Sequence, residues 1–246
     1  MIAQAAPVPD IRYPLSKLSA LVPLDDHDRH LLSEAAKTTH LVQARREILR
    51  EGDPIKRASL ILNGWAFRAR LLPDGRRQIL YFLLPGDAIG LCRHLNPTAL
   101  TTIVSHTNVL LCPAPEPRAE QLHTGLAEAY SMSQVHEEEH LLRHVTRLGR
   151  LGAYDRIIDW LLETGDRLAL SGMGTPDRFP LPLTQEMIAD TLGLTSVHVN
   201  RMLQLMARDK LVRLRNGTAT LMDRAACVRL VDYTGSKARS RTTKFR

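Results

Sequence analysis

The stretch LTQEMIADTLGLTSVHVNRMLQL, residues 183–205, decides the fold of the C-terminal part of the chain. Thr184 and Thr195 each precede a run of apolar residues at helical spacing, and a threonine hydroxyl in that position caps the first turn of a helix. Gly193 lies between the two runs, where a sharp turn needs a positive φ. Ala189, four residues earlier, is small enough to let the two helices cross closely. The stretch therefore predicts a helix-turn-helix.

The residues that follow predict a hairpin attached to this motif. Two short runs, 211–214 and 218–222, flank the dipeptide Asn216-Gly217, which favours a tight hairpin turn because both residues tolerate a positive φ. A helix-turn-helix joined to such a hairpin is a winged helix, which binds double-stranded DNA. The alternative is a helical hairpin that packs in an unrelated core. The basic residues around the motif suit phosphate contacts; they are Arg208, Lys210, Arg213 and Arg215.

The second helix of the motif presents the side chains that we expect to read DNA. Val197 would contact a thymine methyl group, and His198 would reach a base or a phosphate. Thr184 and Thr195 would contact the DNA backbone at the two helix caps, and the arginines of the hairpin would bind phosphates. The complete set of expected DNA-contacting residues is Thr184, Gln185, Thr195, Ser196, Val197, His198, Asn200, Arg201, Arg213 and Arg215.

The charge distribution agrees with a polyanionic partner for the C-terminal half. The 246 residues carry a formal net charge of +7. Residues 1–149 contain 17 basic and 16 acidic residues, whereas residues 150–246 contain 16 and 10. The segment 235–246 has five basic residues and no acidic one, and we expect it to be a disordered tail. A basic C-terminal half is typical of nucleic-acid binding, although it also serves solubility.

Two further properties limit the class of protein. No apolar run approaches the length of a membrane span, and the N-terminus has no signal-peptide features, so we expect a cytoplasmic protein with no membrane partner. The three cysteines are Cys92, Cys112 and Cys227, and their wide spacing excludes a dense disulfide scaffold and a CxxC-type metal site.

The N-terminal half has a sequence pattern typical of an antiparallel β-domain. From Leu41 to Pro113, short apolar runs alternate with turn signals about every ten residues, which indicates a sandwich or small barrel. Asn63-Gly64 and Asp74-Gly75 are dipeptides typical of hairpin turns. Residues 15–35 precede this region as a short helical lead-in.

A long helix is expected between the two halves. Residues 118–150 contain no proline, and their apolar side chains recur mostly three to five residues apart. A helix of that length, about 45 Å, would extend beyond a domain of this size. We therefore expect part of its apolar stripe to pack on a second copy of the chain, giving a homodimer.

Taken together, the sequence resembles the Crp/Fnr family of bacterial transcription regulators over about residues 15–233. The blocks that carry the resemblance are 48–53, 72–79, 84–87, 148–150 and 183–205. The resemblance implies an α+β fold, in which a cyclic-nucleotide-binding-like antiparallel β-roll (15–117), a long dimerisation helix (118–150) and a winged helix-turn-helix (151–234) precede the tail. It also implies a near-palindromic operator in which Arg201 reads a guanine, RNA polymerase as a partner, and no catalytic activity.

The sequence departs from the family at the sites that hold its ligands. The cyclic-AMP binders of the family have a Gly-Glu pair where this chain has Gly90-Leu91, and an arginine that the segment 98–103 lacks. The N-terminal cysteines that hold an iron–sulfur cluster in other members are also missing. We therefore predict no cofactor and leave the effector open. Ser196 and Val197 replace an arginine and a glutamate of the cyclic-AMP receptor protein, so that protein's operator does not transfer.

Two short motifs suggest other kinds of site. His136-Glu137-Glu138-Glu139-His140 matches the HExxH pattern of zinc peptidases, and His144 continues the same stripe. The alternative interpretation is a charged, solvated face of the long helix, and a third is a metal or pH sensor. Cys92 and His94 are residue types that bind haem, although a buried cysteine beside a surface histidine fits them as well. Two other functions follow from these motifs. One is a small-molecule or metal sensor whose winged helix binds protein, and the other is a zinc peptidase.

Overall fold

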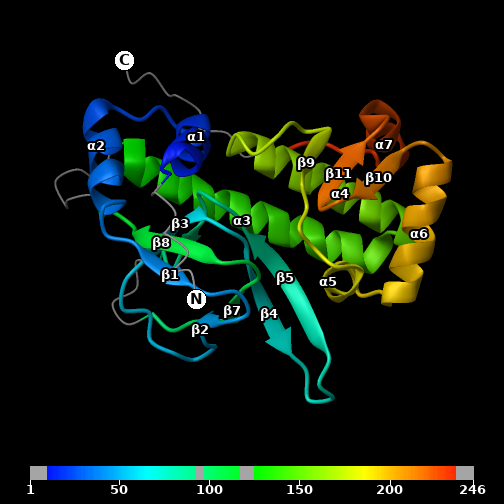
Figure 1. Cartoon of the computed structure of the whole chain (residues 1–246), viewed down its shortest axis with the longest axis horizontal. Coiled ribbons are helices and arrows are strands. Elements are labelled where there is room, and N and C mark those ends of the chain that lie inside the picture. The colour runs from blue at the N-terminus through cyan, green and yellow to red at the C-terminus, as the bar shows by residue number, and fades with distance from the viewer. Residues whose placement is uncertain (1–9, 92–96, 117–124, 237–246) are drawn as a thin grey trace, which may run out of the picture. The chain divides into compact units, whose positions relative to one another are not determined.

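The computed structural model describes residues 10–91, 97–116 and 125–236 (Figure 1). The chain divides into two compact units. Within the described ranges, the first contains residues up to 68 together with 82–134, and the second contains 69–81 together with residues from 135 onwards. None of the helices in these ranges combines the length and the apolar character needed to span a membrane.

Two four-stranded sheets form the N-terminal domain, which confirms the predicted antiparallel β-roll. One sheet has the strand order β1-β8-β3-β6, and the other has the order β2-β7-β4-β5. Leu60 of β3 pairs with Cys112 of β8 and with Ala88 of β6 in antiparallel register. The strands are β1 His40–Val42, β2 Glu47–Leu49, β3 Ser59–Asn63, β4 Ala66–Leu71, β5 Arg77–Leu83, β6 Ala88–Ile89, β7 Thr102–Ser105 and β8 Val109–Pro113.

The two Gly-containing dipeptides of this region play different parts. Asp74-Gly75 joins β4 to β5 with Gly75 at φ +83°, and the predicted hairpin is confirmed. The hairpin predicted at Asn63-Gly64 is wrong, because β8 and β6 already pair with the two edges of β3. The chain instead turns there into the other sheet. Gly64 has φ +90°, and a Cβ on it would lie 2.1 Å from the carbonyl oxygen of Asn108.

Helices cover one side of the β3–β8 sheet. Leu60 and Leu62 of β3 belong to the same hydrophobic cluster as Leu18, Leu126 and Tyr130 from the helices. Side chains alternate along a strand, so the intervening residue of β3 faces the other side of the sheet. The helices are α1 Arg12–Leu21, α2 Asp26–Ala35 and the first turns of α3, Gly125–Arg150.

The helical lead-in expected over 15–35 is two helices rather than one. Asp25 caps α2, since its carboxylate accepts a hydrogen bond from the backbone N–H of Asp28 at 2.7 Å. The Asp28 carboxylate accepts one from the N–H of Asp25 in return, which completes a capping box. A buried ion pair between Lys17 of α1 and Asp87, just before β6, fastens α1 to the sheet.

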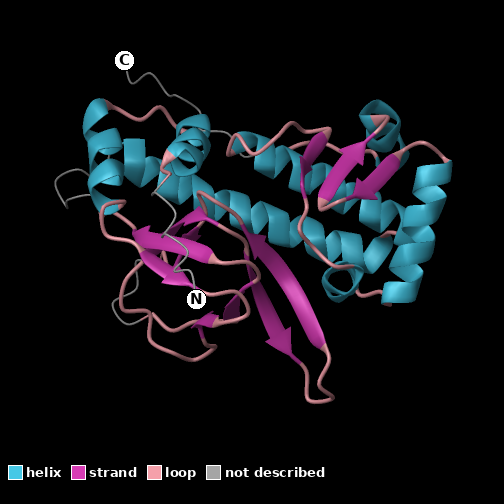
Figure 2. Ribbon diagram, in the orientation of Figure 1, coloured by secondary structure: helices cyan, strands magenta, loops and turns pink. Residues whose placement is uncertain are grey.

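The second unit holds the helical C-terminal part of the chain (Figure 2). The expected long helix ends at Arg150 as predicted and is described from Gly125 onwards; residues 117–124 lie outside the described ranges, as does the expected tail from 237. Helix α7 is an addition that the sequence did not predict. The elements after α3 are α4 Ala153–Leu170, β9 Arg178–Pro180, α5 Gln185–Leu192, α6 Ser196–Arg208, β10 Val212–Arg215, β11 Thr218–Leu221 and α7 Arg224–Val231.

Candidate nucleic-acid interface

The helix-turn-helix forms as predicted, with both of its caps in place. The Thr184 hydroxyl accepts a hydrogen bond from the N–H of Met187, and the Thr195 hydroxyl accepts one from the N–H of His198, each at 3.2 Å. Gly193 ends α5 at φ +63°. A hydroxyl that accepts a cap bond still has its own hydrogen to donate. Both threonines can therefore cap a helix and bind an anion at the same time.

The exposed face of α6 carries the predicted reading residues. Val197 is 78% exposed, and Ser196 and Arg201 are also exposed, whereas His198 and Asn200 are half-buried. Val199 and Met206 are buried on the opposite face, which fixes the rotation of the helix. A large apolar side chain such as Val197 held in water is a candidate for an apolar contact in a complex.

The predicted residues Gln185 and Asn200 contact each other. The side-chain N–H of Asn200 on α6 donates a hydrogen bond to the side-chain oxygen of Gln185, the first residue of α5, at 3.0 Å. The sequence predicts that both residues lie at the DNA, but not that they contact each other. The predicted helix-turn-helix suggests such a contact in general terms, because the crossing of its two helices brings the start of α5 near the first turns of α6.

The wing is a hairpin with an additional strand. Asn216 and Gly217 have φ values of +50° and +67°, as the predicted tight turn requires. On the other side of the hairpin, β11 pairs with β9 through Ala219 and Phe179. Arg213 and Arg215 are two residues apart in β10 and therefore project from the same face of the sheet.

The helix-turn-helix and the wing enclose a groove with a volume of about 380 Å³. Gln185 and Asn200 line it from the helices, and Arg213 and Arg215 line it from the wing. Across residues 10–91, 97–116 and 125–236, neither these two arginines nor Arg201 has an acidic partner. Three guanidinium groups without counter-ions beside a concave polar surface form a site for a polyanion.

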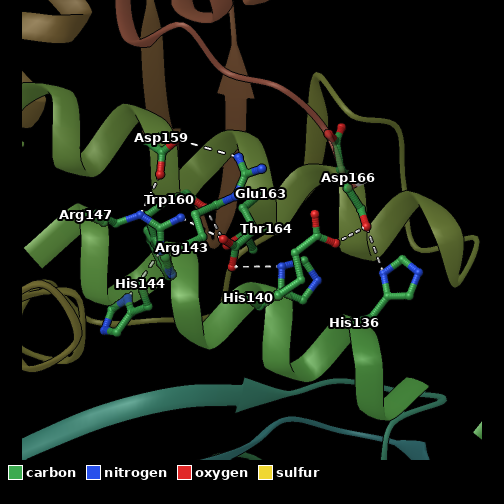
Figure 3. Close-up of polar contacts among 12 residues, drawn as sticks. His136, His140, Arg143, His144, Arg147, Asp159, Trp160, Glu163, Thr164 and Asp166 are labelled. Carbon is green, nitrogen blue, oxygen red and sulfur yellow. Dashed lines mark hydrogen bonds and ion pairs between the residues drawn. The ribbon is translucent and has the colours of Figure 1, made fainter. Parts of the chain in front are cut away.

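A second group of charges is buried where α3 lies against α4 (Figure 3). Arg147 is only 1% exposed, and its guanidinium binds the Asp159 carboxylate at 2.7 Å and the Glu163 carboxylate at 2.6 Å. The two acids are four residues apart and share one face of α4. This cluster was not predicted from the sequence. The signal was the presence of both acids inside the apolar run of α4, where an unpaired charge would be costly.

The HExxH run is divided among separate partners, as Figure 3 shows for its histidines. His140 lies 3.7 Å from the Glu163 carboxylate, His144 lies 3.2 Å from Arg147, and His136 lies 3.1 Å from the Ser236 hydroxyl. The interpretation as a solvated face is wrong for His140 and His144, which are buried, because α4 covers this side of α3. Among the described residues, no group of three histidine, cysteine or acidic side chains is placed to hold a metal ion.

Burial shapes the electrostatics of this cluster. Burial alone would raise the pKa of Glu163, but the attraction of Arg147 and the neighbouring His140 outweigh it and hold that pKa well below its usual range. Burial and repulsion by Arg147 lower the pKa of His144 from 6.5 to about 4. Glu163 is therefore charged and His144 neutral near pH 7, and the cluster is closed to solvent and to ligands.

The last residues of α5 are held by side chains from other elements. Arg77 of the β4–β5 hairpin forms an ion pair with Asp190 at 2.5 Å, and Gln78 donates a hydrogen bond to the Thr191 carbonyl oxygen at 2.9 Å. Arg156 of α4 donates one to the Leu192 carbonyl oxygen at 2.7 Å. These contacts cap the carbonyl end of α5 and fix the helix on which α6 rests.

Comparison with known proteins places both parts of the chain. Residues 39–124 match the family model of the cyclic nucleotide-binding domain, and residues 155–229 match the Crp-like helix-turn-helix domain. The nitrogen fixation regulation protein FixK of Bradyrhizobium diazoefficiens is 34% identical over 168 residues, which are 67% of this chain and 70% of the relative. The transcriptional activator FnrL of Cereibacter sphaeroides is 29% identical over 189 residues, which are 74% of this chain and 75% of the relative.

A solved structure has the same fold. FixK2 from Bradyrhizobium japonicum superposes with a TM-score of 0.69 at 25% sequence identity, and the match covers 81% of this chain and 98% of FixK2.

The cyclic nucleotide in the name of the first domain does not fit the residues present. Such a ligand needs a cation for its phosphate, yet residues 90–91 and 98–103 contain neither a basic nor an acidic side chain. Within the second segment, Ala99 and Ile103 are buried in the protein core. Cys92 and His94, considered above as haem ligands, lie outside the described ranges. No role for a nucleotide follows from this site.

The matches therefore agree with the winged helix described above. The two domain models match in the order in which the β-roll and the helix-turn-helix occur. The chain belongs to the Crp/Fnr family of DNA-binding transcription regulators.

Proposed function

We propose that the chain regulates transcription as a homodimer that binds a near-palindromic operator through the groove between α6 and the wing. The observation that carries this proposal is the state of Arg201. Its guanidinium is exposed, has no acidic partner in the described chain, and lies on a helix whose start is fixed by Thr195. An arginine held in this way can bind the O6 and N7 atoms of a guanine.

The neighbouring residues have complementary roles in this proposal. Ser196 and Asn200 face base edges with Arg201, and Val197 contacts a thymine methyl group. Thr184 and Thr195 lie at the helix starts and contact the DNA backbone, as His198 does where it does not meet a base. Gln185 faces the DNA from the start of α5. Arg213 and Arg215 bind phosphates from the wing.

The dimer forms through α3. Val135, Leu142 and Val145 are 46%, 63% and 69% exposed, and their separations of seven and three residues put them on one stripe of the helix. Apolar side chains at this spacing pack against the same stripe of a second helix. A two-fold dimer then spaces its two recognition helices one DNA turn, about 34 Å, apart.

The remaining parts of the chain complete the proposal. The β-roll of residues 15–117 receives a signal whose chemistry is open, the helix of residues 118–150 joins the protomers, and residues 151–234 bind DNA. The basic segment 235–246 adds non-specific attraction to DNA. RNA polymerase is the partner through which a regulator of this kind acts.

Selection of bound duplexes from a random library by the purified full chain tests this function. We expect an enriched two-fold symmetric motif, and an affinity that falls with salt by a slope of about −0.9 for each phosphate contacted. An unenriched library together with binding that does not depend on salt would contradict the proposal. It would favour a sensor whose winged helix binds protein.

The dimer has a test of its own. We expect the double variant Leu142→Glu/Val145→Glu to sediment as a monomer and to lose affinity for the full palindrome, because like charges would face each other across the helix pair. Its affinity for a single half-site should stay close to that of the wild-type protomer. A double variant that remains dimeric would place the interface elsewhere.

A further inference from the structure

The bond between Gln185 and Asn200 has a chemical consequence for base recognition. Gln185 is the first residue of α5, and the Thr184 cap fixes the backbone on which it is mounted. Its side-chain oxygen accepts a hydrogen bond from the amide of Asn200 at 3.0 Å. Both residues line the groove between α6 and the wing, where we propose that DNA binds.

This bond decides which atoms Asn200 offers to a base. The asparagine amide has two N–H donors and one oxygen acceptor, and a half-turn about its last bond exchanges the donor and acceptor sides. When the N–H that points away from the amide oxygen is the one bound to Gln185, the other N–H and the oxygen remain side by side on one edge. In the major groove, a paired donor and acceptor match the N7 and N6 atoms of adenine.

We infer that Gln185 is a positioning residue that holds the Asn200 amide for adenine at one base pair of each half-site. The inference rests on the proposed function and deepens it, since it assigns a base to Asn200 and a role in specificity to Gln185. A glutamine at this position that contacted only the DNA backbone would raise affinity for every sequence equally. A glutamine that orients Asn200 instead alters the preference at a single position.

Three variants separate the two roles. Asn200→Ala removes the reading group. Gln185→Met keeps the length of the side chain but removes the acceptor, whereas Gln185→Glu keeps an oxygen that accepts from Asn200. Both Gln185 variants change an exposed side chain, and thermal melting should show that they fold like the wild type.

The measurement is duplex selection with each full-length variant, followed by competition binding on the selected site. We expect adenine at one position of the wild-type half-site and loss of that preference in Asn200→Ala, by roughly 5- to 150-fold. Gln185→Met should lose about three- to tenfold of the preference at the same position, and the guanine assigned to Arg201 should be unaffected. Gln185→Glu should keep the adenine preference while it binds all sequences more weakly, because its carboxylate repels the phosphates.

A modified base gives an independent readout. Replacement of that adenine by 7-deazaadenine removes the N7 acceptor, and we expect this to weaken the wild type by about tenfold and Gln185→Met by much less. A uniform loss of affinity in Gln185→Met, with base preferences intact, would overturn the positioning role. Enrichment of guanine at the position that depends on Asn200 would overturn the amide orientation.

The outcomes also separate this inference from the proposed function. If wild-type protein selects no motif, the proposed function itself fails. If it selects a motif that Asn200→Ala leaves unchanged at every position, the operator-binding function stands and only the inference fails.

Discussion

Arginine serves opposite purposes in two regions of the second unit. At the contact of α3 with α4, Arg147 is buried and bound to two carboxylates. On the outer face of α6 and on the wing, Arg201, Arg213 and Arg215 are exposed and have no acidic partner within the described ranges. A buried guanidinium bound to two carboxylates holds helices together and has nothing left to offer a ligand. An exposed one adds little to stability but is available to a polyanion.

Loss of Arg147 should be the most damaging single change on the buried side of this comparison. We expect Arg147→Met to lower the free energy of unfolding by about 3–5 kcal/mol, because Asp159 and Glu163 would stay buried and lose the guanidinium that binds both, which leaves Arg143 at 3.9 Å from Asp159 and His140 at 3.7 Å from Glu163. Urea denaturation followed by circular dichroism measures the change. Arg150→Ala, at the exposed end of the same helix, is the matched control and should stay within about 0.5 kcal/mol of the wild type.

A companion variant shows whether charge imbalance is the cause. If Arg147→Met is destabilising because two acids lose their partner, then Arg147→Met/Asp159→Leu/Glu163→Met should recover much of the stability. A triple variant as unstable as the single one would indicate that the guanidinium acts mainly through its packing.

The next largest effect on the buried cluster should be the pH dependence of the free energy of unfolding. The folded pKa of His144 is about 4 and its unfolded value is 6.5, so the unfolded chain takes up a proton that the folded chain excludes. The contribution of His144 to the free energy of unfolding is therefore fully present above pH 6.5 and is lost as the pH decreases toward 4. The expected loss is about 2 kcal/mol between pH 6.5 and roughly pH 5, at 1.36 kcal/mol per pKa unit.

His144→Gln serves as the comparison for this measurement. Its stability should change less with pH over that interval, because glutamine does not titrate. Glu163 contributes only at lower pH, since its folded pKa lies below its unfolded value of 4.5. Equal slopes for His144→Gln and the wild type would show that His144 titrates normally in the folded protein.

Removal of Arg201 should affect DNA binding and not stability, the opposite of the effect expected for Arg147. We expect Arg201→Ala to lose about 1–3 kcal/mol of discrimination at one base pair, because a bidentate contact with guanine disappears. The unfolding free energy should stay within about 0.5 kcal/mol of the wild type, since the side chain has no acidic partner to lose. Competition binding on the selected operator gives the first quantity, and urea denaturation gives the second.

The wing arginines should show the smallest effect per residue. Arg213→Ala and Arg215→Ala should each reduce the salt slope of binding by about 0.9 and leave the base preferences unchanged. Arg229→Ala, an exposed charge on α7, provides the control for a general effect of net charge. A change of base preference in either wing variant would assign the wing a reading role instead.

The sequence allowed prediction of those parts of the fold that depend on neighbouring residues. The caps at Thr184 and Thr195, the turn at Gly193 and the hairpin at Asn216-Gly217 each form as expected. All four depend on contacts or dihedral angles within a few residues. Asn63-Gly64 has the same local signal as the wing turn, but its outcome was decided by strands that lie far away in the sequence.

The contacts that the sequence did not predict all join separate elements. Arg147 meets its acids across 12 and 16 residues, and Asn200 meets Gln185 across 15. Charge and amide type alone do not indicate which helix faces will meet. The burial of His140 was misjudged for the same reason, because a stripe of polar residues on α3 indicates solvent until α4 is known to cover it.

The contacts at the end of α5 also determine the electric field of that helix. The peptide dipoles of an α-helix give its first turn a positive potential and its last turn a negative one. In α5 Thr184 is the N-cap and the first turn carries Gln185 and the acidic Glu186, while the last carbonyl groups accept hydrogen bonds from Gln78 and Arg156. The positive charge of Arg156 offsets the negative end, and Arg77 offsets the charge of Asp190. The negative end of the helix is thus offset by cations, while the Glu186 carboxylate offsets part of the positive potential at the end where a phosphate would bind.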